Sequence, residues 1–161
     1  MKTLPQKWLI SSFQGNRLSS TWNTVDFFVA RILVIDDDPD MRVLLEQTLK
    51  SAGHEAVLAA DGSEGVERYH ANPADLVITD LYMPNQEGLE TIAELRRRSP
   101  DVPIIAISGR AAAETMLSIA MKLGALEVLQ KPFLIEDLLI TVSRALGGKD
   151  PDDNAAKKTR A

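Results

Sequence analysis

The sequence contains no cysteine among its 161 residues. This absence excludes disulfides, thiol nucleophiles and thiolate metal sites, and it fits a reducing compartment. No apolar run approaches the roughly 20 residues that a membrane-spanning helix needs. The apolar stretch Trp8-Leu9-Ile10 is also too short for a secretion signal. We therefore expect a cytoplasmic protein without a membrane partner.

Positive charge is scarce in the central part of the chain. The whole sequence carries −5, and residues 29–146 hold 11 Lys and Arg against 19 Asp and Glu. Nucleic-acid binding depends on neutralising phosphates with Lys and Arg, so we expect no nucleic-acid partner. We interpret the one basic run, Arg96-Arg97-Arg98, as the solvated end of a helix, where cations are favoured.

Histidine is scarce as well, and both histidines, His54 and His70, lie at the periphery of expected helices and strands. Neither has a carboxylate pattern beside it, so we interpret both as ordinary surface residues. No histidine phosphodonor is therefore evident within this chain.

What the chain does contain is a regular alternation from Arg31 onward. Short apolar, β-branched runs alternate with stretches of helical periodicity, of which the first is opened by Pro39 and closed by Gly53. The strand-like runs are residues 31–35, 56–60, 76–79, 103–107 and 126–130. Five strand–helix units in succession predict an α/β fold, a doubly wound five-stranded parallel sheet with helices on both faces.

The two ends of the sequence differ from this alternating part. Residues 1–28 hold both tryptophans and show no sustained periodicity, and we expect an N-terminal extension that is either disordered or an annotation artefact. Residues 29–147 are expected to form one domain. Residues 148–161 are expected to form a loose polar tail.

Polar residues follow the carboxyl ends of four expected strands. Strand 31–35 is followed by Asp36-Asp37-Asp38, strand 76–79 by Asp80, strand 103–107 by Ser108 and strand 126–130 by Lys131. In an open α/β sheet, ligands bind beyond these carboxyl ends. The sequence therefore predicts several carboxylates, one hydroxyl and one ammonium at a single edge.

Crowded carboxylates repel one another unless a cation intervenes, and hard oxygen ligands suit Mg²⁺. A magnesium site would explain the acidic cluster and would keep Asp80 ionised as a nucleophile towards a phosphoryl group. Each residue also has a simpler interpretation by itself. Asp38 is well placed as the N-cap of the helix opened by Pro39, Asp80 could be a turn residue, and Lys131 could be a surface lysine.

These residues resemble the receiver domain of bacterial two-component response regulators. The resemblance covers about residues 31–146 and rests on four motifs, namely ILVIDDDPDMR, VITDLYMPNQEGLE, IIAISG and EVLQKPF. It implies the flavodoxin-like receiver fold with strand order 2-1-3-4-5. We also expect a stand-alone, single-domain response regulator of the chemotaxis type with no DNA-binding output domain, because only about a dozen polar residues follow Gly148.

The resemblance assigns a role to each matching position. Asp80 matches the phosphorylated aspartate, Ser108 the switch hydroxyl and Lys131 the ammonium partner, with a cis peptide between Lys131 and Pro132. Asp36, Asp37, Asp80 and the backbone carbonyl of Tyr82 match the Mg²⁺-binding set. Many members have Tyr or Phe where this chain has Val128, which has no ring to rotate.

Several function classes follow. The leading one is a phosphoacceptor that assists its own phosphorylation and dephosphorylation without being an enzyme. Its partners would be a histidine kinase or histidine phosphotransfer protein and a downstream protein target, and it would be a monomer or weak dimer. The alternative is a phosphorylation-independent pseudo-receiver. An aspartyl phosphatase would require a second catalytic acid at the position of Tyr82. A flavodoxin-like redox protein is also disfavoured, because the three aspartates after the first strand would repel the flavin phosphate.

Overall fold

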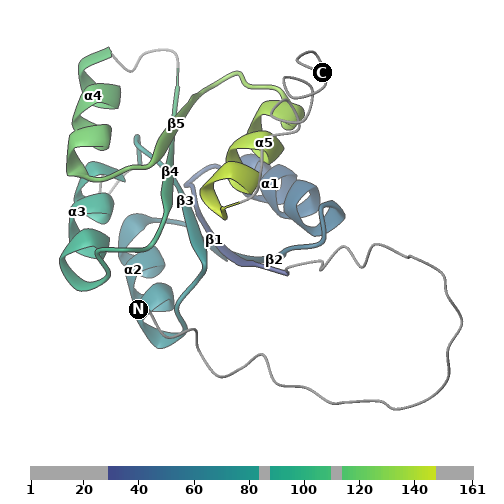
Figure 1. Ribbon diagram of the computed structural model, residues 1–161, viewed down its shortest axis with the longest axis horizontal. Coiled ribbons are helices and arrows are strands. Elements are labelled where there is room, and N and C mark those ends of the chain that lie inside the picture. The colour runs from purple at the N-terminus through teal and green to yellow at the C-terminus, as the bar shows by residue number, and fades with distance from the viewer. Residues whose placement is uncertain (1–28, 84–87, 110–113, 148–161) are drawn as a thin grey trace, which may run out of the picture.

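The computed structural model describes residues 29–83, 88–109 and 114–147, and the expected extension 1–28 and tail 148–161 lie outside these ranges. Strands and helices alternate along the chain, as the sequence predicts (Figure 1). The strands are β1 (Arg31–Ile35), β2 (Glu55–Ala59), β3 (Leu76–Asp80), β4 (Ile104–Ser108) and β5 (Glu127–Gln130). The helices are α1 (Pro39–Ser51), α2 (Gly62–Ala71), α3 (Gly88–Arg98), α4 (Glu114–Leu123) and α5 (Ile135–Ala145).

All neighbouring strands are parallel, and their order in the sheet is β2-β1-β3-β4-β5. The expected fold class and strand order are thereby confirmed. The register pairs Ile35 with Thr79 across β1 and β3, and Asp80 with Ile107 across β3 and β4. The strand order reverses between β1 and β3, so the carboxyl ends of these two strands form the topological switch point.

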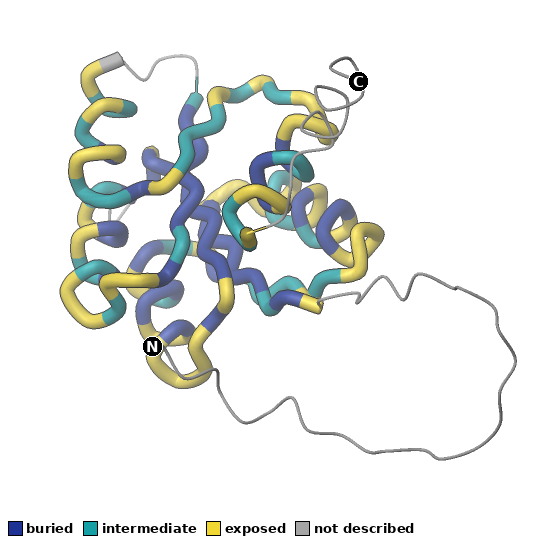
Figure 2. Tube along the Cα trace, viewed as in Figure 1, coloured by how far each residue is buried: buried dark blue, intermediate teal, exposed yellow. Residues whose placement is uncertain are grey.

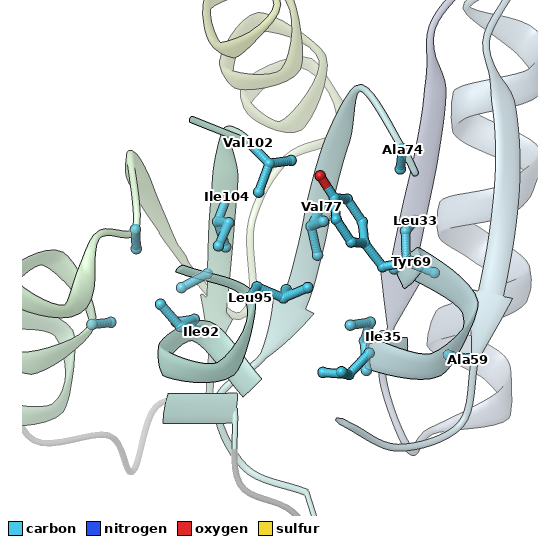
Figure 3. Packing of buried hydrophobic residues seen from close by; sticks show 14 of the residues in the cluster. Leu33, Ile35, Ala59, Tyr69, Ala74, Val77, Ile92, Leu95, Val102 and Ile104 are labelled. Carbon is cyan, nitrogen blue, oxygen red and sulfur yellow. The ribbon is translucent and has the colours of Figure 1, made fainter. Parts of the chain in front are cut away.

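Helices cover both faces of the sheet, so each central strand is buried on both sides (Figure 2). One face packs against α2, α3 and α4, where Leu33, Val77 and Ile104 meet Tyr69, Ile92 and Leu95 (Figure 3). The other face packs against α1 and α5 through Leu45, Leu49, Leu138 and Val142. Successive strand residues point to opposite faces, which assigns alternate residues of β1, β3 and β4 to the two cores.

The N-terminus of α1 is built as the sequence predicts. Asp38 has an extended backbone, and its side chain accepts hydrogen bonds from the backbone N–H groups of Asp40 and Met41. Pro39 occupies the first turn, where its missing N–H is not needed. Asp38 is therefore the N-cap of α1, and this capping role distinguishes it from Asp36 and Asp37.

The interpretation of the basic run was right for two of its three residues. Arg97 and Arg98 are exposed and pair with Glu94. Arg96 is half-buried and donates to the backbone carbonyls of Gly124, Ser99, Pro100 and Val102. It therefore joins the end of α3 to the end of α4, a role that a solvated residue would not have.

The interpretation of His54 as a surface residue was wrong. Its ring is half-buried, and its Nδ1 accepts the backbone N–H of Ala30 at 3.3 Å. Burial lowers the pKa of His54 below its ordinary value. His70, by contrast, is exposed on α2 as expected.

In the described part of the chain, none of the helices combines the length and the apolar character that crossing a bilayer requires.

Candidate phosphoacceptor and metal site

The fold gathers the predicted residues at the carboxyl edge of the sheet. Asp36 directly follows β1, Asp80 is the last residue of β3, Ser108 is the last residue of β4 and Lys131 follows β5. Parallel strands place these ends on one side of the molecule. Because β1 lies beside β3, Asp36 and Asp80 come from adjacent strands.

Lys131 bridges the two buried aspartates. Its Nζ lies 2.5 Å from Oδ2 of Asp80 and 3.0 Å from Oδ2 of Asp36, across 51 and 95 residues of chain. Asp36 is 1% exposed and Asp80 is 6% exposed, whereas the side chain of Lys131 keeps 21% of its surface in contact with solvent. The peptide between Lys131 and Pro132 is cis, as the resemblance implies. One ammonium thus offsets part of the negative charge at this edge.

Burial and pairing act against each other on these ionisable groups. Burial raises the pKa of Asp36 above its ordinary value, even though hydrogen bonds from Lys131 and from the backbone of Asp38 act in the opposite direction. Burial also opposes the charged form of Lys131, but the hydrogen bonds that its ammonium donates to Asp80 and Asp36 outweigh burial and raise the Lys131 pKa. Lys131 therefore remains an ammonium at neutral pH, and ionised Asp36 is held at some free-energy cost.

Asp80 is held at both carboxylate oxygens. Oδ2 accepts from Lys131, and Oδ1 accepts the backbone N–H of Tyr82 at 2.8 Å. This bond places the main chain of Tyr82 beside Asp80, although the residue as a whole is about half exposed. The Tyr82 carbonyl remains an expected metal ligand.

Ser108 lies at the same edge, and its hydrogen bonds join it to Gly109 and Lys131. It is fully buried, its backbone carbonyl accepts the N–H of Lys131 at 2.6 Å, and its hydroxyl donates to the Gly109 carbonyl over a long 3.4 Å. The expected switch hydroxyl therefore lies on β4, the strand next to the one that ends at Asp80, and it makes a weak hydrogen bond to the Gly109 carbonyl.

Three carboxylates at this edge could hold a metal ion. Asp36, Asp37 and Asp80 each offer an oxygen, and these oxygens all lie within 4.8 Å of one another. Asp36 and Asp80 are buried and Asp37 is exposed, so the cluster is open on one side. An all-oxygen set of this kind suits a hard divalent cation such as Mg²⁺, which retains several waters. The donor chemistry therefore fits the metal that the resemblance implies.

Two further residues that support the site were not singled out from the sequence. Arg42, on α1, donates from Nη1 to the backbone carbonyl of Asp36 at 2.6 Å. Gly88, at the start of α3, packs against the backbone of Asp80 and Leu81 so closely that a β-carbon would lie 2.6 Å from the Leu81 Cα. The spacing of Arg42, six residues after Asp36, was the available signal for the first contact. Nothing in the sequence pattern signals the second.

Val128 lies in β5, paired with Ala106 of β4 and partly buried against the core beneath α3 and α4. It packs as an ordinary aliphatic strand residue. No aromatic ring is therefore available at this position to rotate between an inward and an outward orientation.

Comparison with known proteins agrees with this geometry. The family described as the response regulator receiver domain matches residues 32–143. Among curated proteins, the response regulator MprA of Mycolicibacterium vanbaalenii is 35% identical over 127 residues, covering 79% of this chain and 54% of MprA. The transcriptional regulatory protein PrrA of Mycobacterium bovis is 30% identical over 129 residues, covering 80% and 55%. The chain thus spans about half the length of these relatives.

Solved structures agree in fold. The chemotaxis protein CheY4 of Vibrio cholerae is 31% identical with a TM-score of 0.69, over 73% of this chain and 99% of that chain. A response regulator receiver domain protein from Clostridium thermocellum is 32% identical with a TM-score of 0.70, over 74% and 95%. With the family match, the strand order and the four residues at the carboxyl edge in agreement, this chain belongs to the response regulator receiver domain family.

Proposed function

We propose that this protein accepts a phosphoryl group on Asp80 from a phosphohistidine of a partner, either a histidine kinase or a histidine phosphotransfer protein. The observation that carries the proposal is the position of Asp80 at the end of a central strand, buried, bonded to Lys131 and within reach of two more carboxylates. A carboxylate is an established nucleophile in aspartyl-phosphate chemistry.

The transfer is an in-line displacement. One carboxylate oxygen of Asp80 forms a bond to phosphorus, the P–N bond to the partner's imidazole breaks, and the imidazole nitrogen keeps the electron pair and is then protonated. Asp36, Asp37, Asp80 and the Tyr82 carbonyl would hold Mg²⁺. The bound ion would neutralise charge on the phosphoryl oxygens.

Protein side chains supply the rest of the site. Lys131 would move little when Asp80 is phosphorylated, because its ammonium already contacts Asp80 and can donate to a phosphoryl oxygen attached there. Ser108 would exchange its weak bond to the Gly109 carbonyl for a stronger, charge-assisted one to the phosphoryl group. Asp36 keeps Lys131 in place from the other side.

The chain in this proposal is a phosphoacceptor that assists its own phosphorylation and dephosphorylation, not an enzyme with a separate substrate. The phosphorylated state would signal through protein–protein contacts. Because Val128 has no ring, the change would be carried by Ser108 and the residues that follow it, without an aromatic rotation.

The test uses the full chain, Mg²⁺ and acetyl phosphate as a small phosphodonor, with intact mass measured before and after incubation. We expect a mass gain of one phosphoryl group that is lost when Mg²⁺ is chelated and absent in Asp80→Asn. No gain in the wild type would favour the phosphorylation-independent pseudo-receiver. A gain that persists in Asp80→Asn would place the acceptor elsewhere.

A further inference from the structure

Helix α4 is packed less deeply than the other helices of the described domain (Figure 2). Among its side chains from Thr115 to Leu123, only that of Ala120 is buried. The helices α1, α2, α3 and α5 each bury three or four residues. Segments with few buried contacts open or shift more easily than the elements around them. Since Ala120 lies in the C-terminal half of α4, the packing of this helix is also uneven along its length.

The C-terminal end of α4 receives a charged contact as well. Gly124 directly follows the helix, and its backbone carbonyl accepts from Nε and Nη2 of Arg96 at 3.1 and 2.6 Å. The Nη1 of the same guanidinium donates to the carbonyls of Ser99, Pro100 and Val102, between α3 and β4. Hydrogen bonds from a charged donor are roughly twice as strong as neutral ones. One planar group therefore joins the end of α4 to the end of α3.

Gly124 is shaped for this contact. Its φ is +110°, and a β-carbon there would lie 2.5 Å from Nε and 2.9 Å from Cδ of Arg96. Gly53 also has a positive φ, +87°, but a β-carbon at that position would meet nothing within 4 Å. The positive φ is therefore shared by two helix ends, whereas the close approach of a guanidinium distinguishes Gly124 from Gly53.

The chain beyond Gly124 continues directly into the sheet. Ala125 is buried, and its N–H donates to the Ala120 carbonyl at 2.9 Å. The N–H of Leu126 donates to the carbonyl of Ile104, in β4, at 2.7 Å. From residue 115 to residue 119, by contrast, every side chain of α4 is exposed or half-buried. Helix α4 is therefore anchored at its C-terminal end and only lightly held over the turns before it.

We propose that Arg96 is the pivot of α4, which swings about its Gly124 end while its N-terminal half moves furthest. Two N–H groups of Arg96 share the Gly124 carbonyl, so a small rotation of the helix can shift the load between them without losing the contact. This swing belongs to the unphosphorylated chain. Only its use in signalling rests on the proposed function, in which a phosphoryl group on Asp80 would draw on Ser108, at the end of the strand before α4.

Amide hydrogen exchange of the unphosphorylated full chain, resolved by NMR and corrected for intrinsic rates, tests the pivot. In the wild type we expect the amides of Lys122 and Leu123 to exchange severalfold more slowly than those of Ser118 and Ile119. All four lie beyond the first turn of α4, whose amides lack helical partners in any case. Helix α3, which buries residues along its whole length, should show no such gradient beyond its first turn.

Substitution of Arg96 should remove this gradient. In Arg96→Gln we expect Lys122 and Leu123 to exchange as fast as the amides before them, because the Gly124 carbonyl loses its charged donors. Arg96→Lys should restore part of the difference, since an ammonium can still donate to one carbonyl but lacks the planar fork that spans both connections. Protection in α1 and α5 should stay as in the wild type.

A pair of glycine variants tests the same contact from the other side. In Gly124→Ala the new β-carbon would displace the Arg96 side chain, so we expect the same loss of protection at the end of α4. Gly53→Ala has a similarly unfavourable backbone but no side chain to displace, and it should leave the α4 gradient unchanged. If circular dichroism shows that Arg96→Gln does not fold, Arg96→Lys and Gly124→Ala decide.

Three results would overturn the proposal. Equal protection along α4 in the wild type would show that the helix does not swing about one end. A loss of protection in Arg96→Gln that α1 and α5 share equally would show that Arg96 contributes to global stability alone. The same α4 exchange in Gly124→Ala and Gly53→Ala would remove the Arg96 contact from the explanation. None of these measurements uses a phosphodonor or Mg²⁺, so failure of the pivot is distinguishable from failure of Asp80 as the acceptor.

Discussion

Lys131 and Asp36 are 95 residues apart in the chain, yet the ammonium of one lies 3.0 Å from a carboxylate oxygen of the other. The same ammonium contacts Asp80, so a single cation separates two buried anions. Removing that cation would leave both carboxylates facing each other in a poorly solvated site. The pair therefore ties the stability of the domain to the electrostatics of its phosphoacceptor site.

The first prediction concerns this ammonium. We expect Lys131→Met to lower the unfolding free energy at pH 7 by about 1–3 kcal/mol, less than for a fully buried pair because Lys131 is partly exposed. The double variant Lys131→Met, Asp36→Asn should recover part of the loss, since one buried charge is then removed. Urea titrations measure both. Lys122→Met, on the exposed surface of α4, is the control. Equal losses in Lys131→Met and the double variant would contradict the prediction.

The second prediction concerns Arg42, whose guanidinium holds the Asp36 carbonyl. We expect Arg42→Gln to weaken Mg²⁺ binding severalfold, because the turn that carries Asp36 and Asp37 loses its tether. Arg42→Lys should retain part of the affinity, since an ammonium can still donate to the carbonyl. Isothermal titration with MgCl₂ measures this without any phosphodonor. Arg68→Gln, which removes an exposed cation paired with Glu64, should bind Mg²⁺ like the wild type.

The third prediction concerns Gly88, which lies against the residue that we propose is phosphorylated. A methyl group there would approach the Leu81 Cα to 2.6 Å and the carbonyl carbon of Asp80 to 2.9 Å. Backbone atoms cannot yield as a flexible side chain does, so we expect Gly88→Ala to destabilise the domain by about 1–3 kcal/mol. Thermal melts measure the loss. Gly109→Ala, where a β-carbon meets nothing within 4 Å, should change little, and similar melts for the two variants would refute the steric argument.

The fourth prediction is a pH dependence at His54. Burial lowers its pKa in the folded state, so the unfolded chain binds the proton more tightly. The contribution of His54 to stability is therefore fully present above the unfolded pKa of about 6.5 and is lost as the pH falls below it. His54→Asn keeps an acceptor for the N–H of Ala30 but does not titrate, so its stability should fall less between pH 7.5 and 5.5.

Urea midpoints of the wild type, His54→Asn and His70→Asn at the two pH values test this prediction. His70 is exposed, so His70→Asn should keep the pH dependence of the wild type. The same dependence in all three proteins would mean that carboxylates alone determine the acid sensitivity of the domain.

The sequence by itself determined the alternation of strands and helices, because apolar runs and helical periodicity are local properties. It also placed Asp36, Asp80, Ser108 and Lys131 at the ends of separate strands, and parallel strands must bring such ends to one edge. The N-cap Asp38 was equally predictable, since its partners are the next few residues.

Tertiary structure decided the contacts that depend on neighbours distant in sequence. Arg96 is half-buried where it contacts Gly124, 28 residues away in sequence, and His54 is half-buried where it contacts Ala30, 24 residues away. The order of the strands, which the family resemblance implied and local patterns did not, puts Asp36 beside Asp80 and allows Lys131 to reach both. Burial, pairing and pKa follow from packing, and packing is a property of the whole fold.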